Sequence, residues 1–279
     1  MLQLFDKVSL TCSKSVTSTY STSFSTAVNM LSPSIRGAIH SIYGFVRFAD
    51  EIVDTFHHSD KAYLLDKFEN DLNEALQMGI SLNPILHSFQ ITVKEYEIDR
   101  HLIDSFMSSM KMDIEKKNYE SRAEYEQYIY GSADVVGLMC LKVFVSGNQE
   151  LYEELKYSAM KLGSAFQKVN FLRDLKDDSE LLNRSYFPNV DLRAMDSPTK
   201  QAIIEEISED FKEAYSGIIR LPQSSRFGVY TAYIYYRQLL KKLEKTESHR
   251  ILETRIRVSN PTKLGLLAKS YVNVKMNLL

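Results

Sequence analysis

The sequence has no tryptophan and few of the residues that interrupt helices: ten glycines and six prolines among 279 residues. Glycine and proline disfavour helix interiors most strongly, so their scarcity allows long helices. Alternating strand patterns bounded by turn dipeptides are also lacking. The two cysteines, Cys12 and Cys140, are too few for a disulfide framework, which favours a reducing compartment.

A secretory signal and a long apolar run are lacking as well. Residues Met1 to Lys7 do not combine a basic start with a following apolar stretch. The most apolar stretch, Val135 to Val145, contains Lys142 and is shorter than the roughly 20 residues that cross a bilayer. We therefore expect a cytoplasmic protein.

Charge is almost balanced overall but unevenly distributed. The 34 lysines and arginines oppose 36 acidic residues, for a net charge of −2. From Arg226 onward there are 11 basic and 3 acidic residues, so the preceding 225 residues carry an excess of negative charge. A solvated basic face explains this, and peripheral contact with the inner face of an anionic membrane is the alternative hypothesis. That hypothesis also rests on apolar residues in the same part, namely Leu264, Leu266, Leu267, Tyr271 and Val274. No nucleic-acid-binding motif is present, so no nucleic-acid partner is expected.

What the sequence does contain is helical periodicity. At 44% apolar and 25% charged residues it can build an ordinary globular core. Ser32-Pro33 is a helix start, and the stripe that follows it consists of Ile35, Ile39, Ile42, Val46, Ala49 and Val53. Similar patterns predict helices near 61–78, 84–97, 99–116, 121–145, 149–180, 198–219 and 226–249. The prediction is one all-α domain over residues 1–279, a helical bundle.

Two pairs of aspartates stand out within these apolar helices. Asp50 and Asp54 are four residues apart and therefore share one helix face. Asp174 and Asp178 repeat the spacing on the helix over 149–180. Like charges at this spacing disfavour a helix by roughly 0.2–0.5 kcal/mol per pair, so a counter-charge is expected.

The two pairs have three interpretations. Each can be a solvated acidic face paired with nearby arginine and lysine. If the helices face each other, the carboxylates form a site for a hard cation such as Mg²⁺, which binds one or two carboxylates together with substrate phosphates. A di-iron bundle normally needs Glu-x-x-His repeats, and no histidine stands three residues after a glutamate. The Mg²⁺ interpretation, with a diphosphate ligand, is preferred.

Ordered motifs over residues 13–271 resemble the squalene/phytoene synthase family, whose members join two prenyl diphosphates head to head. The resemblance implies a helical bundle around a central cavity. The matching segments are Tyr20–Phe24, Arg36, Tyr43–Asp54, Tyr130–Gly137, Gln167–Asp178, Arg184–Pro188, Tyr236 and Arg255–Lys263. The sequence departs from the family pattern at Glu51, Asp134 and Ser185. Asp134 and Ser185 are expected to alter the pocket lining and the accepted chain length, not the reaction class.

The resemblance assigns roles to individual residues. It implies Mg²⁺, with Mn²⁺ as an alternative, held by Asp50, Asp54, Asn170, Asp174 and Asp178. It implies substrate contacts from Ser21, Tyr43, Arg47, Gln167, Asn170, Arg173, Tyr186, Tyr236, Arg255 and Lys263. Aromatic rings would stabilise carbocations through their faces. Tyr130 is the predicted proton-handling or cation-steering hydroxyl, and with the four aspartates it completes the predicted catalytic set.

The activity implied by the resemblance is the coupling of two geranylgeranyl diphosphates to 15-cis-phytoene in carotenoid biosynthesis, through a cyclopropylcarbinyl diphosphate and without NADPH. The alternative is farnesyl diphosphate coupling to dehydrosqualene or squalene. Head-to-tail synthases and terpene cyclases favour Asp-Asp-x-x-Asp motifs, which differ from the spacing here. A non-catalytic assembly or binding protein would be expected to have lost aspartates that this chain keeps. The oligomeric state, the number of metal ions and the double-bond geometry of the product stay open.

Overall fold

The computed structural model describes residues 2–116, 118–180, 186–188, 190, 195–276 and 278, with the backbone alone for 177–180. No strand occurs among these residues, so the all-α prediction is confirmed. The helices are α1 (Leu2–Tyr20), α2 (Thr22–Asn29), α3 (Pro33–Thr55), α4 (Lys61–Met78), α5 (Pro84–Glu95), α6 (Arg100–Glu115), α7 (Arg122–Ile129), η1 (Tyr130–Asp134, a π-helix), α8 (Val135–Val145), α9 (Gln149–Glu180), α10 (Ser197–Ile218), α11 (Gln223–Lys245), α12 (Ser248–Glu253) and α13 (Asn260–Lys275).

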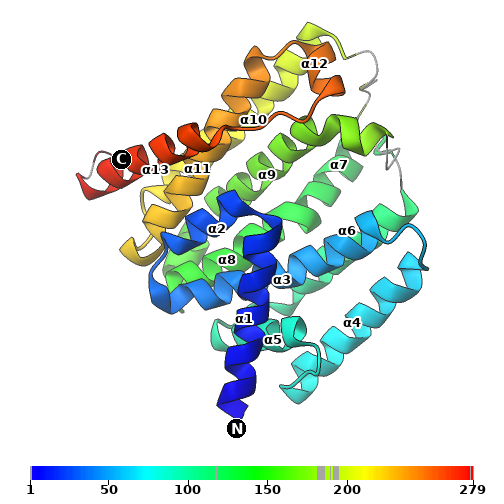
Figure 1. Cartoon of the computed structure of the whole chain (residues 1–279), viewed down its shortest axis with the longest axis vertical. Coiled ribbons are helices and arrows are strands. Elements are labelled where there is room, and N and C mark those ends of the chain that lie inside the picture. The colour runs from blue at the N-terminus through cyan, green and yellow to red at the C-terminus, as the bar shows by residue number, and fades with distance from the viewer. Residues whose placement is uncertain are drawn as a thin grey trace.

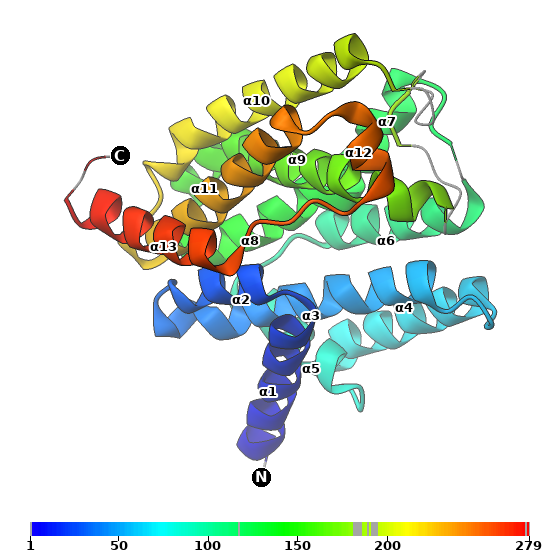
Figure 2. The same ribbon diagram turned by 45° about the horizontal axis from the view of Figure 1, so that its top comes forward.

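The longest helix, α9, lies in the middle of the bundle (Figure 1). It packs against α8 and η1 on one side and against α10, α11 and α12 on the other. α3 packs against α1, α5, α8 and α6, and α1 projects from the body with the N-terminus at its far end (Figure 2). This arrangement places α3 and α9, the two helices with the aspartate pairs, around the same interior.

Helix α1 was not predicted, because its buried stripe is polar. Ser9, Ser13 and Thr17 recur every four residues and are each fully buried, so apolar periodicity does not reveal the packed face. Ser13 Oγ and Ser88 Oγ of α5 are 2.6 Å apart and share a hydrogen bond. A Cβ on Gly44 of α3 would lie only 3.0 Å from Ser13 Oγ. Small residues thus let α1 approach α3 and α5 closely.

The segment Arg122–Val145 runs as one helical stretch through α7, η1 and α8. It has 24 residues and contains an 18-residue window with a mean hydropathy of 1.5, so it is long and apolar enough to cross a membrane, although 67% of that window is buried inside the protein. A core helix of a soluble protein passes the same test, so its length and composition are weak evidence for a membrane span. In the fold this stretch packs between α6 and α9.

Close backbone contact joins this stretch to α9 at two glycines. A Cβ on Gly163 would lie 2.5 Å from the carbonyl oxygen of Ala133, and one on Gly137 would lie 2.6 Å from that of Ala159. Backbone cannot move aside as a flexible side chain can. Only glycine therefore permits this separation between η1–α8 and α9.

We expect Gly163→Ala to lower the free energy of unfolding by about 1–3 kcal/mol, because α9 and η1 must separate to admit the methyl group. Gly265→Ala in α13 is the matched control, since no described atom apart from the helix's own backbone lies within 4 Å of its added Cβ. There, alanine should stabilise the helix by up to about 1 kcal/mol. Urea unfolding of both variants measures the difference, and equal stabilities would contradict the close contact.

Candidate active site

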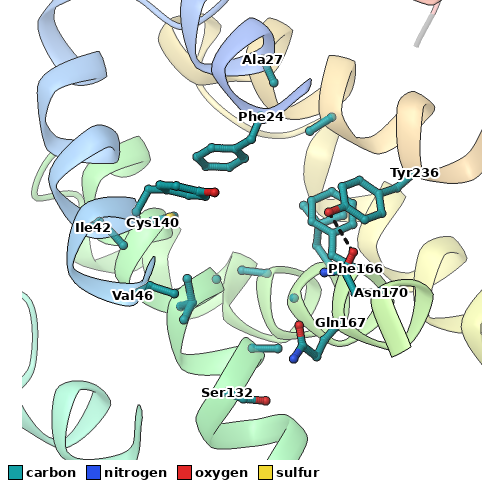
Figure 3. A pocket seen from close by; sticks show the side chains of 18 of the residues that line it. Phe24, Ala27, Ile42, Val46, Ser132, Cys140, Phe166, Gln167, Asn170 and Tyr236 are labelled. Atoms are coloured by element: carbon teal, nitrogen blue, oxygen red, sulfur yellow. Dashed lines mark hydrogen bonds between the residues drawn. The ribbon is translucent and has the colours of Figure 1, made fainter. Parts of the chain in front are cut away.

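A cavity of about 530 Å³ lies between α2, α3, η1–α8, α9 and α11. Its lining follows α9 from Leu155 to Asp174, roughly 28 Å at 1.5 Å per residue. Figure 3 shows Ile42 and Val46 on one side of the cavity and Phe166 and Asn170 facing them from the other.

The cavity is polar at one end and apolar at the other, and the order along the helices is the same on both sides. On α3 the apolar Ile39 and Ile42 precede Arg47, Asp50 and Asp54. On α9 the lining is mainly apolar from Leu155 to Phe166 and mainly polar from Gln167 to Asp174. A ligand with a charged head and a long apolar tail matches this division.

The acidic pair of α3 is confined at the polar end. Burial raises the pKa of Asp50 to about 8, and repulsion by Asp54 and by Asp113 of α6 adds to it, while Arg47 opposes it. Arg47 is in turn ion-paired with Glu51, one turn away. Asp54 stands one residue before the end of α3, where the helix dipole favours cations. The pair is therefore an electrostatically unfavourable cluster that a cation would stabilise.

The acid of α9 is paired differently. Asp174 is ion-paired with the adjacent Arg173 and with Arg255, whose Nε lies 2.8 Å from Asp174 Oδ1. One turn earlier, Asn170 Oδ1 accepts a hydrogen bond of 3.3 Å from the hydroxyl of Tyr236. The predicted counter-charge is thus present on this helix, and it comes partly from a residue 81 positions further along the chain.

Among the described residues, no group of three or more His, Cys, Asp or Glu side chains is close enough to hold a metal ion. The predicted ligand Asp178 and the motif residue Arg184 lie outside the described side chains. Mg²⁺ needs only one or two carboxylates when phosphate oxygens and water complete its shell. Asp50 and Asp54 fit that requirement, because both line the cavity and burial disfavours the charged form of Asp50.

Aromatic rings form the walls next to the charged end. Phe24 stacks on Tyr43 with ring centroids 4.9 Å apart, and Phe166 stacks on Tyr236 at 4.0 Å. Tyr20, not among the predicted residues, holds its ring 4.5 Å from the Arg47 guanidinium. Ser21 lines the cavity too, and its hydroxyl accepts the amide hydrogen bond of Phe24 at the start of α2. These rings and the predicted Tyr186 are available to stabilise positive charge.

The structure does not bring every predicted residue to the cavity. Tyr130 and Lys263 are not among the described lining residues, and the Lys263 amine lies over the ring of Tyr235 instead. Asp134, expected to alter the lining, is also not part of it. Tyr128, two residues before Tyr130, does line the cavity.

Tyr128 and Asp113 were missed by the sequence analysis. The Tyr128 hydroxyl donates a 2.7 Å hydrogen bond to Asp113 Oδ2, and both residues line the cavity. Burial, followed by the charge of Asp113, raises the pKa of Tyr128 well above its usual value, so the phenol stays protonated. The sequence did contain one indication of Asp113. It follows Phe106 and Met110 on the apolar face of α6, and an acidic residue on a buried helix face usually has a specific partner.

The raised pKa of Asp50 predicts a pH-dependent stability. The unfolded carboxyl group loses its proton near pH 3.8 and the folded one near pH 8. The folded state therefore binds more protons in this window, and stability falls as the pH rises through it. Asp50→Asn removes the free-energy cost of ionising this buried carboxyl group. We therefore expect the substitution to raise the Tm in EDTA by at least about 5 °C at pH 9 and much less at pH 5. Melting curves across this range measure the effect, and a Tm difference independent of pH would contradict it.

Comparisons with known proteins identify a family for this chain. Residues 17–262 match the family model described as squalene/phytoene synthase. The chain is 28% identical over 271 residues to chloroplastic phytoene synthase 3 of Zea mays, covering 91% of this chain and 63% of the maize protein. It is 27% identical over 260 residues to phytoene synthase of Arthrospira platensis, covering 84% and 83% of the two chains. The chain thus spans less than two thirds of the length of the maize relative.

Solved structures share the fold. A dehydrosqualene synthase in complex with a ligand superposes with a TM-score of 0.81 at 20% identity, covering 98% of this chain and 99% of the other. The squalene synthase HpnC of Alicyclobacillus acidocaldarius gives 0.74 at 19% identity, covering 86% and 94%. With the family model matched over most of its length and the aspartate-bearing helices around one cavity, this chain belongs to the squalene/phytoene synthase family.

Proposed function

We propose that this protein is a Mg²⁺-dependent prenyltransferase that couples two geranylgeranyl diphosphates head to head to phytoene, in carotenoid biosynthesis. The observation that carries the proposal is the cavity itself, whose charged end joins the α3 and α9 motifs and whose other end is lined mainly by apolar residues. The curated phytoene synthases at 26–28% identity favour this product over farnesyl-derived ones.

The charged end supplies the groups that diphosphate departure requires. Mg²⁺, with Mn²⁺ as an alternative, would be held by Asp50 and Asp54, and it would neutralise the negative charge that develops on the leaving group. Arg173 and Arg255 can exchange Asp174 for diphosphate oxygens, because guanidinium binds both anions in the same bidentate manner. Gln167 and Asn170 would donate further hydrogen bonds.

The apolar part would hold the reacting chains away from water. Once the allylic C–O bond breaks, the cation must meet the double bond of the second substrate before it meets a solvent molecule. The faces of Tyr43, Tyr186 and Tyr236 would stabilise the cation. Loss of a proton, with no reductant, would then give phytoene.

Product analysis tests the proposal. Purified protein with Mg²⁺ is incubated with geranylgeranyl or farnesyl diphosphate, with and without NADPH, and the hydrocarbons are identified by mass. Phytoene from geranylgeranyl diphosphate without NADPH is expected. A product formed only from farnesyl diphosphate would identify dehydrosqualene or squalene synthesis instead, and no hydrocarbon from folded protein would favour a non-catalytic member.

Peripheral membrane contact is a second proposal, because substrates and product are lipids. Of the predicted apolar residues of α13, Leu264 and Tyr271 are exposed, whereas Leu266 and Val274 pack against the core. Val272 and, just after the helix, Met276 are exposed as well, beside Lys263, Lys269 and Lys275. We expect the protein to sediment with anionic vesicles at low salt and to be released above about 0.5 M salt. Replacing the three lysines by glutamine should abolish sedimentation, and equal binding to neutral vesicles would contradict the electrostatic part.

A further inference from the structure

Behind the cavity wall, η1 and α9 are joined by a buried hydrogen bond. Asp134, the last residue of η1, is 8% exposed, and its Oδ1 accepts from Ser164 Oγ of α9 at 2.6 Å. Burial raises the pKa of Asp134 to about 6, whereas the Ser164 bond and the charges of Lys168 and Lys161 oppose this rise. The acid that sequence analysis assigned to the pocket lining therefore belongs to the contact between two helices.

The same face of α9 carries a chain of ion pairs, of which the pair between Lys168 and Asp210 is buried. Lys168 Nζ donates to Asp210 Oδ2 of α10 at 2.7 Å, and Lys161 Nζ lies 2.9 Å from Asp210 Oδ1. Lys168 also pairs with Glu206. Arg122, at the start of α7, donates hydrogen bonds to both carboxylate oxygens of Glu206. The α7–η1 segment is thus fixed at one end by Arg122 and at the other by Asp134.

The opposite side of this segment is the cavity wall. Tyr128, Ser132 and Ala133 line the cavity, and Gln167 lines it from the next turn of α9 (Figure 3 labels Ser132 and Gln167). The Ser132 hydroxyl is buried there and has no hydrogen-bond partner among the described residues. Where the two helices meet, Gly163 leaves no room for a Cβ beside the Ala133 carbonyl, so even a small shift of η1 changes the wall.

The π turn itself needs support. The amide of Val135 donates to the carbonyl of Tyr130, five residues back. Such wide turns are rare and occur mostly as single turns held within α-helices, frequently at functional sites. The π turn of η1 ends at Asp134, and Asp134 is the residue that forms the hydrogen bond with Ser164.

We propose that Asp134 and Ser164 are positioning residues, whose hydrogen bond holds the π turn of η1 against α9 and thereby keeps Tyr128 and Ser132 in place and prevents water from entering through this wall. This inference rests on the proposed function for its catalytic consequence. Neither residue touches the cavity, so each acts through η1.

A loosened wall has a specific chemical consequence. In the intact site, the allylic C–O bond breaks, diphosphate leaves with the electron pair, and the double bond of the second substrate attacks the cation. If water reaches the cation first, its oxygen forms the new C–O bond and its proton passes to the released diphosphate. The product is then a prenyl alcohol, so the ratio of alcohol to coupled hydrocarbon reports wall closure.

We expect Ser164→Ala and Asp134→Ala each to raise this ratio by about fivefold to tenfold, because small displacements of positioning groups cost this much or more. The double variant should match the single ones, since both remove the same bond. Asp134→Asn retains an acceptor oxygen and should stay near the wild-type ratio. Ser216→Ala is the control, because Ser216 shares a 3.2 Å hydrogen bond with Ser158 of α9 and makes no contact with η1 through it.

Two results would overturn the proposal. One is a constant product ratio while total rate and Tm fall together, as partial unfolding alone would produce. The other is a negative result in hydrogen exchange without substrate. There Ser164→Ala should accelerate exchange of the amides of residues 130–135 at least about tenfold and the control should not, so unchanged exchange in Ser164→Ala, or equal acceleration in the control, would overturn the proposal. That second measurement also decides the matter if the wild-type protein converts no prenyl diphosphate, a result that would refute the proposed function alone.

Discussion

Replacing Asp50 by asparagine is expected to lower the rate of prenyl coupling by about three orders of magnitude while the helical fold persists. The substitution keeps the shape of the side chain and removes the charge that would hold the cation. Because burial and Asp54 make the charged form unfavourable, the variant should melt at a higher temperature than the wild type without metal at pH 8. Loss of function combined with a gain in stability is typical of a site that carries unfavourable charge for catalysis.

Asp174→Asn provides the contrast. Coupling should fall similarly, but stability should decrease, because Arg173 and Arg255 lose their shared carboxylate. Product formation and melting curves with and without Mg²⁺ measure both effects. Asp104→Asn on the surface of α6, which breaks only an exposed pair with Arg100, is the control and should change neither. Full activity of the Asp50 variant, or equal Mg²⁺-induced stabilisation of it and the wild type, would refute the proposed metal site.

Tyr128→Phe is expected to reduce coupling by about 100-fold, whereas Tyr130→Phe should change it by less than about twofold. Tyr128 lines the cavity and its hydroxyl bonds to Asp113, while Tyr130 is absent from the described lining. Steady-state kinetics with the same substrate measure both variants. Circular dichroism and melting curves show whether either loss comes from unfolding.

The reverse order of effects would restore the prediction made from sequence, in which Tyr130 carried the hydroxyl.

Asp113→Asn separates two roles for the hydrogen bond between Asp113 and Tyr128. If the carboxylate only orients the phenol, asparagine still accepts the hydrogen bond and most activity should remain. If its charge matters to the cation, activity should fall as far as in Tyr128→Phe.

Much of the fold and part of the site follow from local sequence. Helix α3 was predicted from one apolar stripe and a proline at its first position, and both are observed, although the Ser32 side chain makes no capping bond. The i, i+4 spacing places Asp50 and Asp54 on one helix face, and both line the cavity. The apolar stripe and the shared helix face could be predicted because both depend only on residues that are close together in one helix.

Contacts between distant segments decided the rest. Arg255 reaches Asp174 only because the segment after α12 returns across α9. The Ser/Thr stripe of α1 is a buried face only because α3 and α5 pack against it. The choice of Tyr128 over Tyr130 depends on the π turn between α7 and α8 and on Asp113 of α6. Sequence by itself determined which side chains share a helix face, since helix geometry is local; which faces meet, and with which partners, was decided by packing in the folded chain.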